Sequence, residues 1–258
     1  MMKFKKMHGN GNDFIIIENL TQKISLSKSQ IIKMGDRKKG LGFDQLIAIN
    51  PPKKNNHDLH IKFFNTDGSE ASMCLNGVRS VGAFVWDSNL LPKKPLLLGT
   101  KSNEIWIKPA GSKNVKTIID FPFEEKIPLA DMKLLKKEKV CFVNVGNRHL
   151  VIESKKIDGY DLSDLCMKLR KRNFFRDANI SLWKKNGSTI ESRTNEAGAG
   201  ETLSCGSAAA AIASIAFGSS KKVTIVSKGG KISLTNLGDK LEMIGPAELI
   251  CEGVWIKN

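Results

Sequence analysis

Two of the five cysteines, Cys74 and Cys205, stand in contexts that suit acid–base chemistry. Each follows a polar, turn-rich segment and precedes a run of small and apolar residues, 76–87 or 207–217, which predicts a buried helix. The first amides of such a helix lack intrahelical acceptors and attract an anion. Because the same field lowers the pKa of a thiol, we expect a carboxylate site beside a reactive cysteine at each helix start.

The remaining cysteines, Cys141, Cys166 and Cys251, lie in apolar surroundings and are expected to be small buried hydrophobic residues. The number of cysteines is odd, their spacing is wide and the sequence has no Cys-x-x-Cys motif. This pattern excludes a disulfide framework and a zinc site. It fits a reducing compartment, so we expect a cytoplasmic protein.

Polar residues recur in the second half of the chain in the same order as in the first. The matched positions are 131 to 135 residues apart, which indicates an internal duplication. The matched pairs are Asn12 with Asn147, Gln45 with Asn179, Asn65 with Glu196, and Cys74 with Cys205.

The elements that must position these residues are mostly short strands. Strand-like runs are expected at 14–18, 46–49, 59–64, 105–108, 117–121, 140–145, 150–153, 180–183, 223–227, 231–234, 240–244 and 248–254. Surface helices are expected at 27–35 and 162–172, beside the two buried helices. Together these elements predict a mixed α/β (α+β) fold of two pseudo-symmetric lobes. We place the first lobe at 1–112 plus 249–258, carrying Cys74, and the second at 113–248, carrying Cys205.

Two such lobes facing each other would place one thiol on each side of a carbon next to a bound carboxylate. One thiolate could then remove an α-proton while the opposite thiol supplies a new one. Amides near Leu75 and Asn76 and near Gly206 and Ser207 would stabilise the charge that develops on the carboxylate. We therefore expect a small amino-acid substrate and two-base chemistry without pyridoxal phosphate, metal or other cofactor.

The formal net charge of +15 leaves two interpretations open. It can serve solubility, or it can indicate nucleic-acid binding. The lysines are scattered, aromatic residues make up only 7%, and no nucleic-acid-binding motif is present in the sequence. We therefore expect neither a nucleic-acid partner nor, since no apolar run approaches about 20 residues, a membrane partner.

Six motifs, spread over most of the chain in one order, closely resemble those of the diaminopimelate epimerase family. They are Met7-His8-Gly9-Asn10-Gly11-Asn12-Asp13-Phe14, Gly42-Phe43-Asp44-Gln45-Leu46, Phe64-Asn65-Thr66-Asp67-Gly68-Ser69, Cys74-Leu75-Asn76-Gly77, Gly146-Asn147-Arg148-His149, and Gly198-Ala199-Gly200-Glu201-Thr202-Leu203-Ser204-Cys205-Gly206-Ser207.

The resemblance implies that each lobe is a mixed or antiparallel sheet curled around a central buried helix. It implies conversion of LL-2,6-diaminopimelate to the meso form, a step in lysine and peptidoglycan precursor biosynthesis, by an isomerase that is commonly a homodimer. Cys74 and Cys205 would be the acid/base pair. The resemblance assigns substrate binding to Asn12, Gln45, Asn65, Asn147, Asn179 and Glu196, in addition to the helix-start residues Leu75, Asn76, Gly206 and Ser207. His149 would support the reacting centre.

Three positions depart from the family pattern. Leu75 replaces a glycine, Arg148 replaces a proline, and Ala197 replaces an arginine that would pair with the distal carboxylate of diaminopimelate. Arg148 is a candidate to supply that charge instead.

Because of Ala197, a racemase of another amino acid on the same scaffold is the alternative function. Two further alternatives from other classes are a basic nucleic-acid or scaffold-binding protein without activity and a thiol oxidoreductase.

Overall fold

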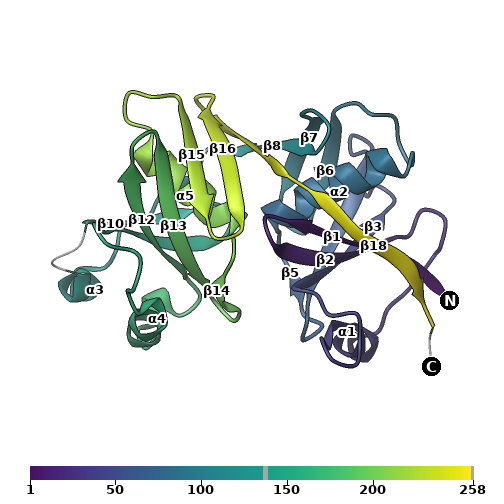
Figure 1. The fold of residues 1–258 in the computed structure, drawn as a ribbon, viewed down its shortest axis with the longest axis horizontal. Coiled ribbons are helices and arrows are strands. Elements are labelled where there is room, and N and C mark those ends of the chain that lie inside the picture. Colours follow the sequence, from purple (N-terminus) through teal and green to yellow (C-terminus); the bar gives the residue numbers. More distant parts are fainter. Residues whose placement is uncertain (136–138, 257–258) are drawn as a thin grey trace. The chain divides into compact units, whose positions relative to one another are not determined.

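The computed structural model describes residues 1–135 and 139–256 and divides the chain into two compact units (Figure 1). The first unit comprises residues 1–119 and the segment from residue 244 onward, and the second comprises residues 120–243. The chain therefore first passes from one unit to the other near the end of β8 (Asn114–Asp120), later than the expected boundary at residue 112. The Gly111 turn instead closes the antiparallel β7–β8 hairpin inside the first unit. Residues 257 and 258 of the expected first lobe lie outside the described residues.

The first unit is a mixed sheet whose strands follow the order β18, β1, β2, β3, β4, β6, β7, β8, with β5 added beside β4. The β2–β3 and β4–β6 pairs are parallel and the others are antiparallel. The bounds of these strands are β1 Met2–Gly9, β2 Asn12–Glu18, β3 Gln45–Asn50, β4 Leu59–Asn65, β5 Glu70–Ala71, β6 Leu96–Gly99, β7 Glu104–Pro109 and β18 Glu248–Trp255.

Helix α2 (Leu75–Asp87) is the buried centre of the first unit, as its uniformly small and apolar sequence predicts. All of its residues except Asp87 are buried. The helix backbone approaches the sheet closely, because a side chain at Gly77 would meet Ile47 on β3 and Phe63 on β4 at 2.9 Å. The helix also contacts β1, β2, β7 and β18, so the sheet curls around it.

A second layer covers the other face of this sheet. Helix α1 (Lys28–Gly35) begins after Ser27, whose hydroxyl accepts a hydrogen bond from the Gln30 amide in a capping box. Ile31 and Met34 on this helix pack into a core that includes Ile15 and Ile17 of β2. Strand β2 is therefore covered by helices on both faces, which explains its continuous run of buried apolar residues.

The second unit repeats the strand pairing of the first, which confirms the predicted duplication. Pairs β10–β11, β12–β13, β13–β14 and β15–β16 are antiparallel, while β11–β12 and β13–β15 are parallel, matching β1–β2 through β6–β7 step by step. A short strand, β9, adds to β10 as β18 adds to β1. The bounds are β9 Phe123–Glu124, β10 Lys139–Asn144, β11 Arg148–Glu153, β12 Asn179–Asn186, β13 Thr189–Glu196, β14 Gly200–Thr202, β15 Lys222–Ser227 and β16 Gly230–Asn236. Strand β17 (Lys240–Pro246) begins in the second unit and ends in the first.

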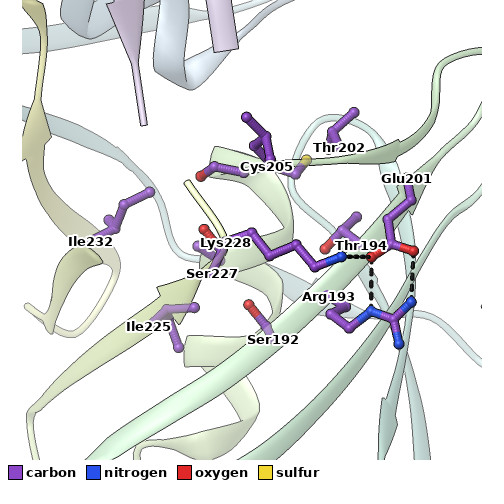
Figure 2. Close-up of a pocket in the computed structure, with 13 residues that line it drawn as sticks. Ser192, Arg193, Thr194, Glu201, Thr202, Cys205, Ile225, Ser227, Lys228 and Ile232 are labelled. Carbon is purple, nitrogen blue, oxygen red and sulfur yellow. Dashed lines mark hydrogen bonds and ion pairs between the residues drawn. The ribbon is translucent and has the colours of Figure 1, made fainter. Parts of the chain in front are cut away.

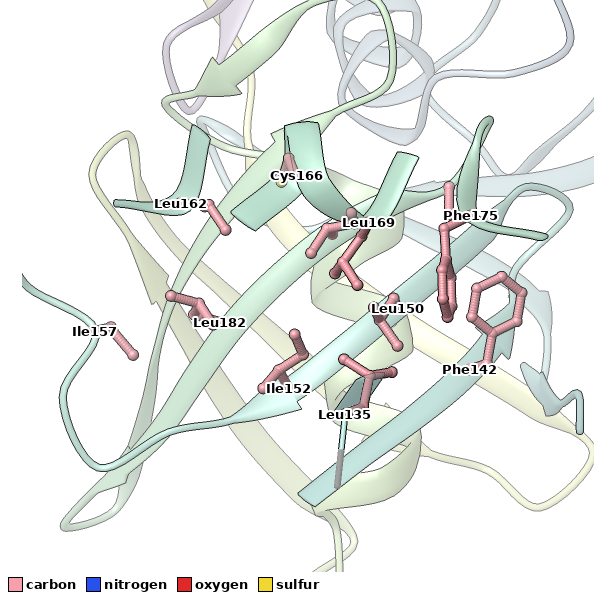
Figure 3. Close-up of a cluster of buried hydrophobic side chains, with 12 residues drawn as sticks. Leu135, Phe142, Leu150, Ile152, Ile157, Leu162, Cys166, Leu169, Phe175 and Leu182 are labelled. Carbon is pink, nitrogen blue, oxygen red and sulfur yellow. The ribbon is translucent and has the colours of Figure 1, made fainter. Parts of the chain in front are cut away.

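Helix α5 (Gly206–Ala216) is the buried centre of the second unit and contacts strands β10, β11, β12, β15 and β16. Helix α4 (Leu162–Arg170) packs on the opposite side of the sheet, where Leu162, Cys166 and Leu169 meet Phe142, Leu150 and other apolar side chains (Figure 3). Shorter helical turns occupy α3 (Leu129–Met132), η1 (Lys133–Leu135) and η2 (Asn173–Phe175). None of the described helices is long and apolar enough to span a membrane.

Candidate active site

Cys74 is the N-cap residue of α2, as the sequence predicts. Its sulfur accepts a hydrogen bond from the Gly77 amide at 3.4 Å, which stabilises a thiolate. Its thiol also donates to Oδ1 of Asn12 at 3.6 Å, which stabilises the protonated form. The side chain therefore has a partner for each protonation state, as a group that gives and takes a proton requires.

Asn12 stands at the start of β2 and is held by neighbouring charges. Its Nδ2 donates to Oδ2 of Asp44 at 2.6 Å, while Oδ1 accepts from Nδ2 of Asn76 at 3.4 Å. The guanidinium of Arg37 binds Asp44 at 2.8 Å and both carboxylate oxygens of Asp13 at 2.7 and 3.1 Å. This charged cluster links the start of β2 to the segment before β3.

Gln45 and Asn65 face each other across β3 and β4. Nε2 of Gln45 donates to Oδ1 of Asn65 at 2.9 Å, and Nδ2 of Asn65 donates to the Ser69 hydroxyl at 3.1 Å. Asp67 in turn accepts from the Ser69 hydroxyl at 2.6 Å and from the Ser69 amide at 2.9 Å, so it shapes this turn. Oε1 of Gln45 is buried and has no hydrogen-bond partner among the described residues.

Cys205 is the N-cap residue of α5 and is 9% exposed. Its thiol donates to Oε2 of Glu196 at 3.2 Å, and the Thr202 hydroxyl donates to Oε1 of the same carboxylate at 2.7 Å. Burial first, and the Glu196 charge second, raise the pKa of Cys205 well above its ordinary value. The expectation of a lowered pKa at this helix start was therefore wrong, because desolvation and a neighbouring carboxylate outweigh the helix field.

Asn147, immediately before β11, and His149, on β11, lie on the same side of the chain, toward α5. Nδ2 of Asn147 donates to the Ser207 hydroxyl at 3.3 Å, and its Oδ1 lies 3.0 Å from Nε2 of His149. His149 is fully buried, which lowers its pKa to about 3 and keeps the ring neutral. Since Oδ1 can only accept, Nε2 carries the proton and Nδ1 is the free acceptor. This Nδ1 is buried without a hydrogen-bond partner among the described residues.

Asn179 pairs with His149 in the parallel β11–β12 ladder, as Gln45 pairs with Phe14 in β2–β3. Its Oδ1 accepts from the Ala197 amide at 2.9 Å, which fixes the loop after Glu196. Ala197 itself is exposed. The repeated polar positions thus occupy equivalent places in the two sheets, which explains their constant spacing in the sequence.

Arg148 points away from this group. Its guanidinium lies over the rings of Phe142 and Phe174, 4.7 and 4.6 Å from their centroids. It also forms ion pairs with Glu125 at 3.4 Å and Asp177 at 3.3 Å. Since Arg148 and His149 alternate along β11, the guanidinium lies on the sheet face opposite His149. These contacts give Arg148 a packing role within the second unit.

A small pocket lies behind Cys205, and its walls include a charged cluster that was not singled out in the sequence (Figure 2). Arg193 binds both oxygens of Glu201 at 2.8 and 2.7 Å, and Lys228 approaches Glu201 at 3.3 Å. The Arg193 hydrogen bond lowers the pKa of Glu201. These bonds fix β14, which carries the Thr202 hydroxyl that orients Glu196.

The helix-start residues lie where the sequence places them. Leu75 is the first residue of α2 and is absent from the positive-φ positions, so a side chain is tolerated where the family has glycine. Asn76 is buried and accepts from Nη2 of the fully buried Arg79 at 2.7 Å. Burial lowers the pKa of Arg79 to about 10, and the neighbouring Cys74 opposes this shift. Gly206 and Ser207 open α5, with the Ser207 hydroxyl 3.5 Å from the Cys205 sulfur.

Of the other three cysteines, only Cys166 is buried as expected. Cys166 is buried, and desolvation raises its pKa to about 11. Cys141 is half-buried, and burial raises its pKa too. Cys251 is exposed on β18, so the prediction of a buried residue was wrong. The apolar pattern around it belongs to a strand that pairs only one described neighbour, β1, and leaves Leu249 and Ile250 about half exposed.

Solved structures share this fold over nearly the whole chain. A Bacillus anthracis phenazine biosynthesis protein of the PhzF family aligns with a TM-score of 0.76 at 14% identity, covering 99% of each chain. A hydroxyproline epimerase from Agrobacterium vitis, with bound trans-4-hydroxy-L-proline, aligns with a TM-score of 0.73 at 10% identity, covering 98% of this chain and 91% of its own. The fold is therefore the mixed α/β fold of PhzF proteins and related epimerases.

Sequence comparison identifies the family. The pattern that defines diaminopimelate epimerases matches residues 4–118 and 141–250. A diaminopimelate epimerase of Coxiella burnetii (strain Dugway 5J108-111) is 32% identical over 278 aligned positions, covering 99% of both chains. The chain belongs to the diaminopimelate epimerase family, whose members are isomerases.

Proposed function

We propose that this protein interconverts LL- and meso-2,6-diaminopimelate by moving one α-proton between Cys74 and Cys205. The observation that carries the proposal is the repetition of one arrangement: each thiol is the N-cap of its unit's central helix and donates to a side-chain oxygen. The family supports diaminopimelate as the substrate.

In the proposed reaction, the helix-start amides of α2 and α5 bind the carboxylate next to the reacting carbon. One cysteine, as thiolate, takes the α-proton, and the other, as thiol, donates a proton to the opposite face. The bond from carbon to the new proton forms as the second S–H bond breaks, so charge is conserved. Glu196 accepts the Cys205 proton when that residue must act as the base.

The amide side chains suit a zwitterionic substrate because they offer donors and acceptors together. Oε1 of Gln45 and Nδ1 of His149 support this role, since each is a buried acceptor without a partner among the described residues. A substrate ammonium is the kind of donor that would satisfy such an acceptor. The proposed reaction needs no pyridoxal phosphate or metal.

The two thiols are tested by Cys74→Ser and Cys205→Ser, with Cys251→Ser as the matched control. Serine is a far weaker acid and base, so each active-site variant is expected to lose epimerisation by about 10²- to 10⁴-fold. The exposed Cys251 variant should keep full activity. The assay is α-deuterium incorporation from deuterated water with LL-diaminopimelate, monitored together with circular dichroism. Near wild-type exchange in either active-site variant would remove the two-thiol mechanism.

A racemase of another amino acid is the second candidate, and Ala197 is the observation that favours it. The position where the family has an arginine carries an exposed alanine, and Arg148 is engaged by Phe142, Phe174, Glu125 and Asp177. Deuterium exchange across a panel of amino acids separates the candidates. Faster exchange into an amino acid that lacks a distal carboxylate would replace diaminopimelate as the substrate.

We further propose a cytoplasmic homodimer. Two reactive thiols require a reducing compartment. The exposed apolar residues of β18, including Leu249, Ile250 and Val254, support association between copies through this strand. Light scattering should give the mass of a dimer, and Ile250→Lys should shift it toward the monomer; a monomeric wild-type protein would contradict the proposal.

A further inference from the structure

We propose that Asp44 is a positioning residue that holds the Asn12 amide with its carbonyl oxygen toward the Cys74 thiol and its NH2 group away from it. This inference deepens the proposed function and rests on Cys74 being one of its two acid–base groups. Asp44 does not contact Cys74 in the described structure and acts through Asn12.

Asp44 accepts every side-chain and backbone hydrogen bond that its carboxylate makes among the described residues. Its carboxylate accepts from Nδ2 of Asn12 at 2.6 Å, from the Asp13 amide at 3.0 Å and from Nη2 of Arg37 at 2.8 Å. Three donors converge on its two oxygens, so Asp44 serves only as an acceptor. A carboxylate that only accepts can bind the NH2 end of an amide but not its oxygen end.

The orientation of Asn12 follows from this restriction. With its NH2 group bound to Asp44, the amide presents Oδ1 to the Cys74 thiol at 3.6 Å and to Nδ2 of Asn76 at 3.4 Å. Arg79 fixes Asn76 in the matching sense, because a guanidinium only donates and Oδ1 of Asn76 accepts from it at 2.7 Å. A donor-only group and an acceptor-only group therefore stand at the two ends of one directional chain.

This orientation has a chemical consequence at Cys74. An acceptor oxygen beside the sulfur stabilises the neutral thiol and opposes the thiolate. A flipped Asn12 would instead donate from Nδ2 to the thiolate and make it a weaker base. The fixed orientation of the Asn12 amide thus keeps the Cys74 thiolate basic enough to recover a proton after the thiol has donated one.

The isosteric variant Asp44→Asn tests whether Asp44 fixes the orientation of the Asn12 amide. Arg37 needs an oxygen at position 44, so the new amide group would face Asn12 and the Asp13 N–H. By turning its own oxygen toward position 44 and its NH2 group toward Cys74, Asn12 gives up its long 3.4 Å hydrogen bond from Asn76 and regains an acceptor-to-donor match with position 44. The rate of Cys74 alkylation by iodoacetamide at neutral pH should rise about five- to tenfold, the value of one exchanged hydrogen bond. Peptide mass spectrometry gives the Cys74 rate, with the exposed Cys251 as the reference in the same sample.

Loss of the Asp44 charge also favours the Cys74 thiolate directly. An Asn12→Ala background separates this charge effect from the effect of turning the Asn12 amide. The other charged groups of this cluster, Asp13, Arg37 and Lys6, and the buried Arg79 behind Cys74 are unchanged in every variant. In an Asn12→Ala background no amide is left to turn, so Asp44→Asn retains only its direct charge effect. The full pH profile of Cys74 alkylation is measured for the wild type, both single variants and the double variant.

The expected result is that Asp44→Asn moves the alkylation profile to lower pH in the wild-type background and much less in the Asn12→Ala background. Equal shifts in the two backgrounds would overturn the positioning role. If Asp44→Asn does not fold, Asn12→Ala alone decides, because an unchanged Cys74 profile in that variant would show that Asn12 does not hold the thiol proton. Asp36→Asn is the control and should leave the profile unchanged, because the Asp36 carboxylate accepts hydrogen bonds from the Lys38 and Lys39 amides and from no other group among the described residues.

Alkylation is measured without substrate, so its outcome is separate from that of the proposed function. Absence of deuterium exchange into any amino acid would refute the proposed function. The pH profile of Cys74 alkylation would still test the role of Asp44 in that case. A wild-type enzyme active on diaminopimelate with equal shifts in both backgrounds would remove the role of Asp44 alone.

Discussion

Replacing Glu196 by glutamine tests the pairing between this carboxylate and the Cys205 thiol. Oε2 of Glu196 accepts from the sulfur at 3.2 Å, and Oε1 is held by the Thr202 hydroxyl at 2.7 Å. Glutamine keeps the size of the side chain and removes its charge. Because the Glu196 charge helps to raise the pKa of Cys205, the variant should favour the Cys205 thiolate.

The size of the effect follows from the separation of the two groups. Two unit charges about 4 Å apart interact by roughly 1 kcal/mol in water and about 4 kcal/mol at an effective dielectric constant of 20. Cys205 is buried and Glu196 is half-buried, so the value lies between these limits. At 1.4 kcal/mol per tenfold change, the Cys205 thiolate fraction at neutral pH should rise by about five- to 700-fold.

Catalysis should move in the opposite direction. In the proposed mechanism, Glu196 takes the Cys205 proton and leaves a thiolate to act as the base. Glutamine cannot take that proton, and general-base assistance of this kind contributes about 10²- to 10⁴-fold to a rate. The variant should therefore alkylate faster at Cys205 while it epimerises more slowly.

The assay compares iodoacetamide labelling of Cys205 with deuterium exchange into the substrate, on the same preparation. Glu191→Gln is the control, because Glu191 lies on the same strand and its side chain pairs with Lys184 instead. That variant should leave both measurements unchanged. Slower or unchanged labelling of Cys205, together with wild-type exchange, would refute the pairing.

Two further predictions concern residues near the proposed site. His149→Phe, which places at this position the residue type of the equivalent Phe14, should make stability less sensitive to acid. The unfolded chain binds a proton at His149 below about pH 6.5, whereas the folded chain binds one there only near pH 3. As the pH falls between these values, the wild type therefore loses about 1.4 kcal/mol of unfolding free energy per pH unit at this residue, and the variant does not. Urea unfolding at pH 7 and pH 4 measures the difference, and equal losses in the two proteins would show that His149 is not a buried neutral group. Arg148→Ala should lower the free energy of unfolding by about 1–3 kcal/mol through lost ring and ion-pair contacts, with an unchanged KM for diaminopimelate. A raised KM at unchanged stability would instead assign its guanidinium to the distal carboxylate.

The sequence does not predict strands β1, β5, β6, β9, β13 and β14, and two of them illustrate how tertiary contacts create a strand that local pattern does not indicate. Strand β13 (Thr189–Glu196) has a polar sequence, yet Thr194 is buried because its hydroxyl pairs with that of Ser181 at 2.9 Å. Strand β1 (Met2–Gly9) carries three lysines, but it pairs with β2 on one side and β18 on the other. Local patterns predicted both central helices because each is apolar on every side, which only a buried position explains.

The positions of candidate site residues could be predicted where a residue has a counterpart in the repeat. Cys74, Cys205 and the matched polar positions lie at equivalent places in the two sheets, and the constant spacing carried that information. Asp44 and Arg37 have no such signal, since their importance arises from contacts with Asn12 and Asp13 more than twenty residues away. Family motifs include Asp44 beside Gln45, but only the hydrogen-bond geometry separates its role from that of its neighbour.

The two half-sites share a topology but solve the same chemical problem differently. At Cys74 the thiol donates to the neutral oxygen of Asn12, from the start of β2, whereas at Cys205 it donates to the charged Glu196, from the end of β13. The residues equivalent to Asn12 and Glu196 in the other unit bind other partners: Asn147 binds Ser207, and Asn65 binds Gln45. A charged acceptor can remove the proton of its thiol, while a neutral amide can only hold it in place. In the mechanism that we propose, this asymmetry gives Cys205 its own base, whereas the protonation of Cys74 depends on the orientation of one amide.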